Sequence, residues 1–174
     1  VVTVANGTHR SCVVLDIDGV LADVRHRLAH LSSNPKDWDA FFAAAAGDPA
    51  IPAGIEFAHT AASTHLVVYL KGRPERIRVT TQYWLDRHEL PAGRLLMRAD
   101  ADHRPATIVK LQHLRELAAE IEIDLVVDDD PLVVGAARRA RFNARLTDWL
   151  PGEPERSPAN DERLSSAQEV DGRT

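Results

Sequence analysis

The feature that most limits what this chain can fold into is a short apolar run that ends in two aspartates. The run Cys12–Leu15 leads directly into Asp16, and Asp18 and Gly19 follow within three positions. A run that is apolar at every position indicates a strand buried on both faces, as in a parallel sheet. Two aspartates at the carboxyl edge of such a sheet indicate a cation or a shared chemical task. For an isolated motif of this kind, a turn with helix-capping aspartates is the alternative.

Strands and helices alternate along the chain. Helical patterns separate the apolar runs, and the pattern over residues 106–121 has the clean 3-4 period of an amphipathic helix. This alternation predicts an α/β fold, a doubly wound Rossmann-like parallel sheet with right-handed crossovers. The expected strands cover about residues 12–17, 65–70, 94–97, 123–127 and 142–146.

Two of the expected helices have recognisable start signals. Asn34 followed by Pro35 predicts a helix start, with proline at the first helical position, and Trp38, Phe41 and Phe42 then recur at helical spacing. We interpret these three aromatic residues as a face packed on the body of the domain. A second helix is expected from Pro74 to about residue 90.

Length and composition indicate one domain. Residues 1–150 of the 174 are expected to form it, whereas residues 151–174 are rich in Pro, Ser, Glu and Arg without periodicity, which predicts a disordered tail. The net charge of −5 argues against a general polyanion-binding protein. The basic run Arg138-Arg139-Ala140-Arg141 is accordingly interpreted as a solvated face, with a nucleic-acid patch as the alternative.

Cysteine content and hydropathy bear on the compartment. Cys12 is the only cysteine, so an intrachain disulfide is excluded and an oxidising compartment is not required. No apolar run reaches the ~20 residues of a membrane span, and the first residues lack the apolar core of a signal peptide. We therefore expect a cytoplasmic protein with no membrane partner.

Charged residues recur where the expected strands end. Because a doubly wound sheet brings these ends to one edge, the residues should converge there. Two carboxylates about 4 Å apart repel by roughly 4 kcal/mol at an effective dielectric of 20, so four acids together require a dication. Oxygen ligands without a cysteine or histidine cluster favour Mg²⁺ over Zn²⁺. The converging residues are Asp16, Asp18, Lys71, Arg73, Lys110, Asp128 and Asp129.

Such a site is suited to a phosphate dianion. Asp16 could attack phosphorus as a carboxylate nucleophile, while Asp18 could protonate the leaving oxygen and later activate water. If Pro74 begins a helix, backbone N–H groups near Gly72 and Arg73 would face the anion.

The same residues resemble a known family. The stretches VVLDIDGVLA from Val13, YLKGRP from Tyr69, VKL around Lys110 and VVDDDP from Val126 are similar, in this order, to the four motifs of haloacid dehalogenase (HAD) superfamily phosphatases. Asp18 is typical of the phosphatase branch. Arg27, eleven residues after Asp16, makes the chain most similar to the 3′-phosphatase domain of phage polynucleotide kinase and to related small bacterial phosphatases.

This resemblance implies specific roles. Asp16 would form an aspartyl-phosphate, and Asp18 would act as general acid and base and give its backbone carbonyl to Mg²⁺. Lys110 would neutralise Asp16 and the phosphate. Asp16, Asp18, Asp128 and Asp129 would form the metal site, whereas Lys71, Gly72, Arg73 and Arg27 would bind the phosphate. The expected substrate is a phosphomonoester, such as a nucleotide or a polynucleotide 3′-phosphate end.

Two positions depart from the family pattern. Lys71 stands where a serine or threonine is usual, and Ala106 stands where related phosphatases often place an acid. An ammonium group at position 71 could pair with Asp16 and slow turnover. A weakly active or non-hydrolytic phosphate-binding module is therefore the alternative function. The short segment between the first two motifs further predicts a small or absent cap and an open site.

Overall fold

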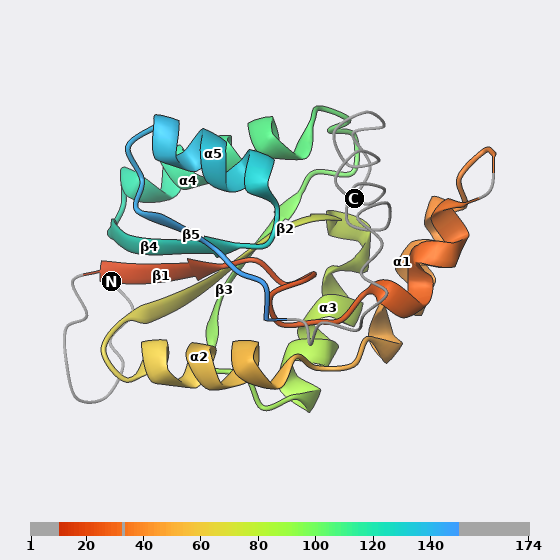
Figure 1. The fold of residues 1–174 in the computed structure, drawn as a ribbon, viewed down its shortest axis with the longest axis horizontal. Coiled ribbons are helices and arrows are strands. Elements are labelled where there is room, and N and C mark those ends of the chain that lie inside the picture. The colour runs from red at the N-terminus through yellow and green to blue at the C-terminus, as the bar shows by residue number, and fades with distance from the viewer. Residues whose placement is uncertain (1–10, 33, 150–174) are drawn as a thin grey trace.

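The computed structural model describes residues 11–32 and 34–149. Within these residues the strands form a five-stranded sheet, ordered β3-β2-β1-β4-β5, in which every pair is parallel (Figure 1). This arrangement confirms the predicted doubly wound α/β fold. The strands are β1 (Ser11–Leu15), β2 (Leu66–Pro74), β3 (Gly93–Arg98), β4 (Glu122–Asp128) and β5 (Ala144–Leu146).

Helices cover both faces of this sheet. Helices α2 and α3 lie on one face, and α4 and α5 lie on the other (Figure 1). The helices are α1 (Trp38–Ala43), α2 (Pro52–Ala62), α3 (Arg78–Arg87), α4 (Ala106–Ala118) and α5 (Pro131–Arg139), with 3₁₀ helices η1 (Arg25–Leu31), η2 (Ala44–Gly47) and η3 (Glu75–Ile77).

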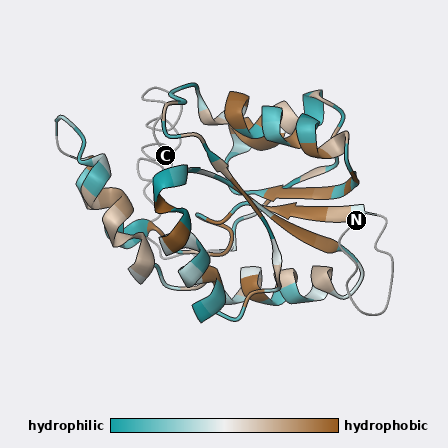
Figure 2. Ribbon diagram, turned by 180° about the vertical axis from the view of Figure 1, so that it is seen from behind, coloured by the Kyte–Doolittle hydropathy of each residue, from teal (hydrophilic) through white to brown (hydrophobic). Residues whose placement is uncertain are grey.

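The central strand β1 is apolar from Cys12 to Leu15 because each face of the sheet needs apolar side chains. Val13 and Leu15 pack in the core beneath α2 and α3, whereas Cys12 and Val14 pack in the core beneath α4 and α5. Successive side chains of a strand point to opposite faces, so both sets are buried. Figure 2 shows the hydrophobic strands enclosed between the two helical layers. Burial also raises the pKa of the Cys12 thiol to about 11, which makes it a weak nucleophile at neutral pH.

The position of β1 determines where a ligand can bind. Strands β2 and β3 extend the sheet on one side of β1, and β4 and β5 extend it on the other. Directly after β1, the backbone N–H of Asp16 donates to the carbonyl of Val127, at 2.9 Å. The chain reverses its winding direction at this point, which is where open α/β sheets bind ligands beyond the carboxyl ends of their strands.

Two predicted helix starts are wrong. Helix α1 begins at Trp38, because the carboxylate of Asp37, and not Asn34, accepts the backbone N–H of Ala40 at 2.9 Å. The helix expected from Pro74 is divided into η3 and α3, and Pro74 itself has the extended backbone of the last residue of β2. Residues 71–74 therefore lie within β2 rather than after it.

The segment between β1 and β2 forms a small helical cap beside the carboxyl edge of the sheet (Figure 1). Trp38, Phe41 and Phe42 of α1 are buried together, as their spacing predicted. No larger unit is inserted between β2 and β4, where the structure has only η3, α3, β3 and α4. The prediction of a small cap is confirmed.

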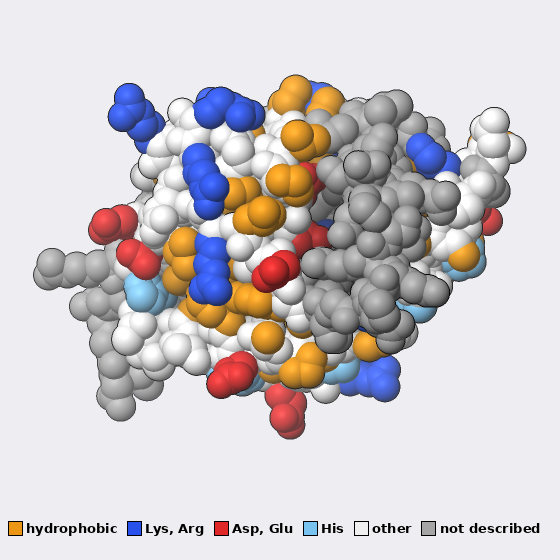
Figure 3. Space-filling view, viewed as in Figure 1, with side chains coloured by type: hydrophobic (Ala, Val, Ile, Leu, Met, Phe, Trp, Pro, Cys, Tyr) orange, Lys and Arg blue, Asp and Glu red, His pale blue; other side chains and the backbone are white. Residues whose placement is uncertain are grey.

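Two further expectations concern the surface and the tail. Arg138, Arg139 and Arg141 are exposed, and basic side chains run over the face formed by α5 and β5 (Figure 3). Residues 151–174, predicted to be disordered, lie outside the described residues. In the described part of the chain, no helix combines the length and the apolar character needed to cross a membrane.

Candidate active site

The structure gathers the predicted site residues at the carboxyl edge of the sheet. Asp16 and Asp18 follow β1, Lys71 and Arg73 belong to β2, and Asp128 ends β4. Lys110 comes from α4, and Arg27 comes from η1 of the cap. All of these side chains are at most 3% exposed. Seven charges with so little access to water must be paired or bind a ligand. Together with the partly buried Asp129, they divide into an anionic and a cationic group.

The anionic group consists of Asp16, Asp128 and Asp129. Each offers a carboxylate oxygen, and these oxygens lie within 4.8 Å of one another. Burial and the charge of Asp16 raise the pKa of Asp128 to about 6, against the opposing charge of Lys110. Burial and the charges of Asp128 and Asp16 hold the pKa of Asp129 well above its usual range. This concentration of negative charge and hard oxygen donors fits Mg²⁺.

Lys110 is the cation nearest to this group. Its Nζ lies 2.7 Å from Asp128 Oδ2 and 3.1 Å from Asp16 Oδ1. Burial alone would lower the pKa of Lys110, but the charges of Asp128 and Asp16 raise it, so the side chain is protonated. Lys71 also contacts Asp16, at 3.2 Å, but two ammonium groups cannot neutralise three carboxylates, which leaves the group short of positive charge.

Gly19 makes room for the third carboxylate. Its φ of +78° lies in the left-handed region, and a Cβ atom at this position would come 1.8 Å from Asp129 Oδ2. Glycine is therefore required both by the turn and by the approach of Asp129. The neighbouring Asp130 has a different task, since its carboxylate caps α5 by accepting the N–H of Leu132 at 2.8 Å.

The carboxylate of Asp18 does not belong to the anionic group. It accepts Arg73 Nε at 3.1 Å, and it also lies 2.9 Å from Arg27 Nη2 and 3.0 Å from Lys71 Nζ. Burial by itself would raise the pKa of Asp18, but the charges of Arg27, Arg73 and Lys71 outweigh it and hold that pKa well below its usual range. The carboxylate of Asp18 thus faces the cations, and the contact of its backbone carbonyl with a metal stays what the family resemblance implies.

Lys71 stands between the two aspartates that follow β1. Its Nζ is 3.2 Å from Asp16 Oδ2 and 3.0 Å from Asp18 Oδ2. The pairing with Asp16 that we considered from the sequence is thus present in this structure. A phosphate bound here would compete with both carboxylates for the ammonium group.

Sequence reasoning missed one residue of this site, Asp48. It is buried between η2 and α2, and its carboxylate accepts Arg27 Nε at 2.8 Å and Nη2 at 2.9 Å, and Arg73 Nη2 at 2.7 Å. His26 Nε2 lies 2.8 Å from the same carboxylate, and the backbone carbonyl accepts Trp84 Nε1 at 2.8 Å. Asp48 therefore fixes both arginines, and the sequence signal was a lone acid in an alanine-rich segment.

Arg73 also has a donor without an acceptor. Its Nη1 is buried and, within residues 11–32 and 34–149, has no hydrogen-bond partner. Leaving a buried donor unsatisfied costs about 1–3 kcal/mol, more when the group is charged. An anionic ligand would supply the missing acceptor.

Comparison with known proteins places these residues in a family. The family described as the polynucleotide kinase PNKP phosphatase domain matches residues 10–145, a range that includes every candidate residue above. The chain belongs to this family. It is accordingly a phosphatase of the HAD type, as its four motifs predicted. No curated protein matches the chain.

Solved structures share the fold of this PNKP-type phosphatase domain. One chain in a Pnkp1/Rnl/Hen1 complex superposes with a TM-score of 0.68 at 22% identity, over 82% of this chain and 47% of that one. A chain of the Pnkp1/Rnl/Hen1 RNA repair complex gives 0.67 at 23% identity, over 79% and 42%. The present chain thus spans less than half the length of these two relatives. A putative phosphatase from Clostridium difficile has a TM-score of 0.58 at 12% identity, over 88% and 92%.

Proposed function

We propose that this phosphatase is a Mg²⁺-dependent phosphomonoester hydrolase that acts through an aspartyl-phosphate on Asp16. The observation that carries the proposal is the division of the site into two groups on either side of Asp16. Carboxylates that need a dication lie on one side, and cations that need an anion lie on the other. A phosphoryl group at Asp16 would give the cationic group its anion and would add oxygen ligands for a dication held by the anionic group.

The carboxylates of Asp16, Asp128 and Asp129 and the backbone carbonyl of Asp18 would hold Mg²⁺. When bound, the ion would neutralise charge on the phosphoryl oxygens and on the carboxylates. The donor set fits it, because the oxygens converge within 4.8 Å and Lys110 and Lys71 supply only two positive charges against three carboxylates. Lys110 supplies the permanent positive charge on the same side of the nucleophile.

The residues of this chain would divide the reaction into two displacements. In the first, Asp16 attacks phosphorus, the bond between phosphorus and the leaving oxygen breaks, and Asp18 gives a proton to that oxygen. Asp18 would carry this proton only in the complex with phosphate, because a bound phosphate draws Lys71, Arg27 and Arg73 away from the carboxylate whose pKa they otherwise hold low. In the second, Asp18 takes a proton from water, the resulting hydroxide attacks phosphorus, and Asp16 is released as a carboxylate with inorganic phosphate. Lys71, Gly72, Arg73 and Arg27 would bind the phosphoryl oxygens, and Arg73 Nη1 is the donor that awaits one.

For the substrate we propose nucleotides or the 3′-phosphate ends of polynucleotides. The family match to polynucleotide kinase phosphatase domains supports this class. The small cap also leaves no large unit that would have to enclose the whole substrate, so a long chain could present its end to the site.

The direct test measures inorganic phosphate released from a 3′-phosphorylated oligonucleotide, its 5′-phosphorylated isomer and a sugar phosphate. We expect release from the 3′-phosphorylated oligonucleotide with Mg²⁺, and a rate lower by about 10²–10³-fold with excess EDTA, since the ion supplies several kcal/mol of charge stabilisation. Re-adding Mg²⁺ should restore the rate. Equal rates with Mg²⁺ and with EDTA would contradict the metal-dependent mechanism.

Lys71 supports one alternative, a phosphate-binding module with little or no turnover, because its ammonium group already pairs with Asp16. The variant Lys71→Ser decides between the two functions. If the protein is an enzyme, removing this pairing should raise kcat by about tenfold, the equivalent of about 1.4 kcal/mol. Arg94→Ser, which changes an exposed cation paired with Glu120, should leave kcat unchanged.

If the protein is a phosphate-binding module, both the original protein and Lys71→Ser should bind inorganic phosphate in calorimetry but release none from any of the three substrates. A measurable rate in the original protein, whether or not Lys71→Ser increases it, would exclude the non-hydrolytic alternative.

A further inference from the structure

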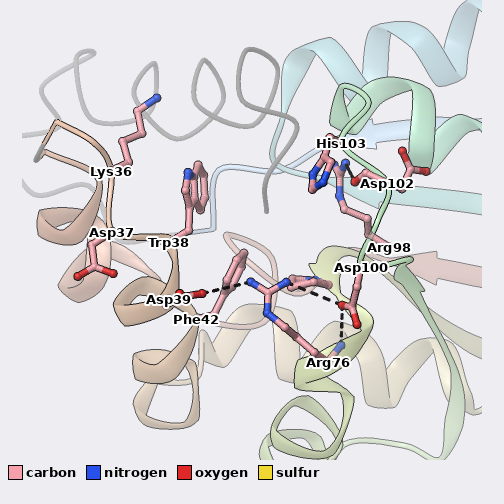
Figure 4. Close-up of a pocket in the computed structure, with 11 residues that line it drawn as sticks. Lys36, Asp37, Trp38, Asp39, Phe42, Arg76, Arg98, Asp100, Asp102 and His103 are labelled. Carbon is pink, nitrogen blue, oxygen red and sulfur yellow. Dashed lines mark hydrogen bonds and ion pairs between the residues drawn. The ribbon is translucent and has the colours of Figure 1, made fainter.

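A pocket of about 200 Å³ opens next to the proposed phosphate site. Helix α1 and residues 36–37 before it form one side, and the loop of residues 99–105 with η3 forms the other (Figure 4). Pro74, which lines the pocket, directly follows Arg73 along β2. Arg98 also lines it and donates from Nε to the carbonyl of Gly72 at 3.1 Å. The pocket and the phosphate site therefore share one strand end.

The α1 side of the pocket is aromatic. Trp38 and Phe42 both line it, and their rings are stacked with centroids 5.8 Å apart and planes 27° apart. Phe41 packs edge-on against both rings and holds them in place. This side thus presents a preorganised aromatic wall.

The opposite side is polar and fixed. The guanidinium of Arg98 donates from Nη1 to the carbonyls of Asp102, at 3.0 Å, and Arg104, at 2.6 Å, so it anchors the loop. Arg76 extends from η3 between the two sides, with Nη2 3.5 Å from Asp39 Oδ1 and Nη1 3.8 Å from Asp100 Oδ1 (Figure 4). Its guanidinium carbon lies 5.3 Å from the centre of the Phe42 ring. Arg76 and Asp100 thus offer donors and acceptors opposite the aromatic wall.

The charge around the pocket excludes one kind of occupant. Four carboxylates line it beside three cations and one histidine, so a second phosphate or a phosphodiester would meet more like charges than opposite ones. The volume is also below the roughly 300–1,000 Å³ of pockets that enclose a whole ligand, so it suits one part of a larger molecule. These lining residues are Asp37, Asp39, Asp100, Asp102, Lys36, Arg76, Arg98 and His103.

An aromatic wall facing a guanidinium and carboxylate oxygens suits a planar, uncharged group with hydrogen-bonding edges. Nucleobases are bound in this way, by stacking on aromatic rings or guanidinium planes and by polar contacts to their edges. We propose that this pocket binds the base of the nucleotide whose 3′-phosphate lies at Asp16. The inference rests on the proposed function. It means that the pocket determines which class of phosphomonoester the enzyme accepts.

The kinetic test compares adenosine 3′-monophosphate with glycerol 2-phosphate, a phosphomonoester that has no base. Arg76→Ala should raise KM for adenosine 3′-monophosphate about tenfold more than KM for glycerol 2-phosphate, because only the first loses a contact to its base. Arg76 is about half exposed and its ion pairs lie at the surface, where such pairs add little to stability, so the variant should fold. The matched control Arg94→Ala should alter neither KM. An equal change in both values for Arg76→Ala would overturn the proposal.

A binding measurement keeps this inference separate from catalysis. Adenosine, which has no phosphate, should quench tryptophan fluorescence in the original protein and in Trp149→Phe, but not in Trp38→Phe. Quenching that persists in Trp38→Phe, or none in the original protein, would overturn the base pocket whether or not phosphate is released. If instead no substrate is hydrolysed while adenosine quenches through Trp38, the proposed function fails and the base pocket stands.

Discussion

Replacing Asp16 by asparagine is expected to reduce phosphate release from a 3′-phosphorylated oligonucleotide by about 10⁴-fold or more, as loss of a covalent nucleophile does in other enzymes. An amide cannot attack phosphorus, and it removes one charged oxygen from the group formed with Asp128 and Asp129. The measurement is a single-turnover assay at saturating Mg²⁺, so that weakened metal binding is not mistaken for lost chemistry.

The loss should occur without unfolding. In Asp16→Asn, Lys110 keeps its contact with Asp128 at 2.7 Å and Lys71 keeps its contact with Asp18 at 3.0 Å, so neither lysine loses every partner. Circular dichroism should therefore match that of the original protein. The control Asp124→Asn changes a half-exposed aspartate of β4 and should retain full activity. A rate in Asp16→Asn within tenfold of the original would show that Asp16 is not the nucleophile.

The sequence predicted the sheet because its information was local. Cys12 and Val14 face one layer of helices and Val13 and Leu15 face the other, so these four positions of β1 had to be apolar. Charged residues were confined to the ends of the strands, and the parallel topology alone brought Asp16 and Asp128 to the same edge. Residues whose place depends on strand direction could thus be located without coordinates.

The residues that escaped prediction depend on contacts between segments. Asp48 follows an alanine-rich stretch and gives no local sign of a partner, yet it binds Arg27, which is 21 positions earlier, and Arg73, which is 25 positions later. The pocket beside the site was missed for the same reason, since Trp38 and Phe42 were interpreted as core alone. They are core residues, but they also line a space that exists only where α1 approaches the loop of residues 99–105.

Helix starts failed for a different reason. Asn34-Pro35 and Pro74 both have the sequence pattern of a helix N-terminus, but neither begins a helix. A side-chain cap three residues after Asn34 sets the start of α1, and strand pairing keeps Pro74 in β2. Asp37 caps α1 through Ala40, and Pro74 pairs with Arg98 in the sheet. A tertiary contact therefore overrode local preference at Pro74, whereas at Asn34 a second local signal, the cap at Asp37, set the helix start.

Asp48→Asn is expected to lower the free energy of unfolding by about 3–5 kcal/mol, because it leaves the two buried guanidinium groups of Arg27 and Arg73 with a single counter-charge, that of Asp18. Both oxygens of Asp48 accept from arginines, whereas asparagine has one acceptor oxygen and would turn its NH₂ group toward a guanidinium. The loss is a large share of the roughly 5–15 kcal/mol that stabilise a domain. Urea denaturation followed by circular dichroism measures it.

A matched control tests whether the loss of stability depends on the burial of the broken ion pair. Glu120→Gln breaks an ion pair with Arg94 whose side chains are both about half exposed, so it should change the unfolding free energy by less than about 1 kcal/mol. Asp48→Glu keeps the charge on a longer side chain, so its loss of unfolding free energy should lie between those of Asp48→Asn and Glu120→Gln. If Asp48→Asn proved as stable as Glu120→Gln, Asp48 would not be the residue that holds the arginines.

The same substitution should also act on the phosphate site, because Arg27 and Arg73 reach Asp18 from positions that Asp48 fixes. In the folded fraction of Asp48→Asn, KM for the phosphomonoester should rise more than kcat falls, since the nucleophile Asp16 keeps its own partners. A double variant with Arg27→Met, whose side chain needs no counter-charge, should lose less stability than the sum of the two single changes. Additive losses would mean that Asp48 and Arg27 stabilise the cap independently, and that the arginines at the phosphate site are positioned by other contacts.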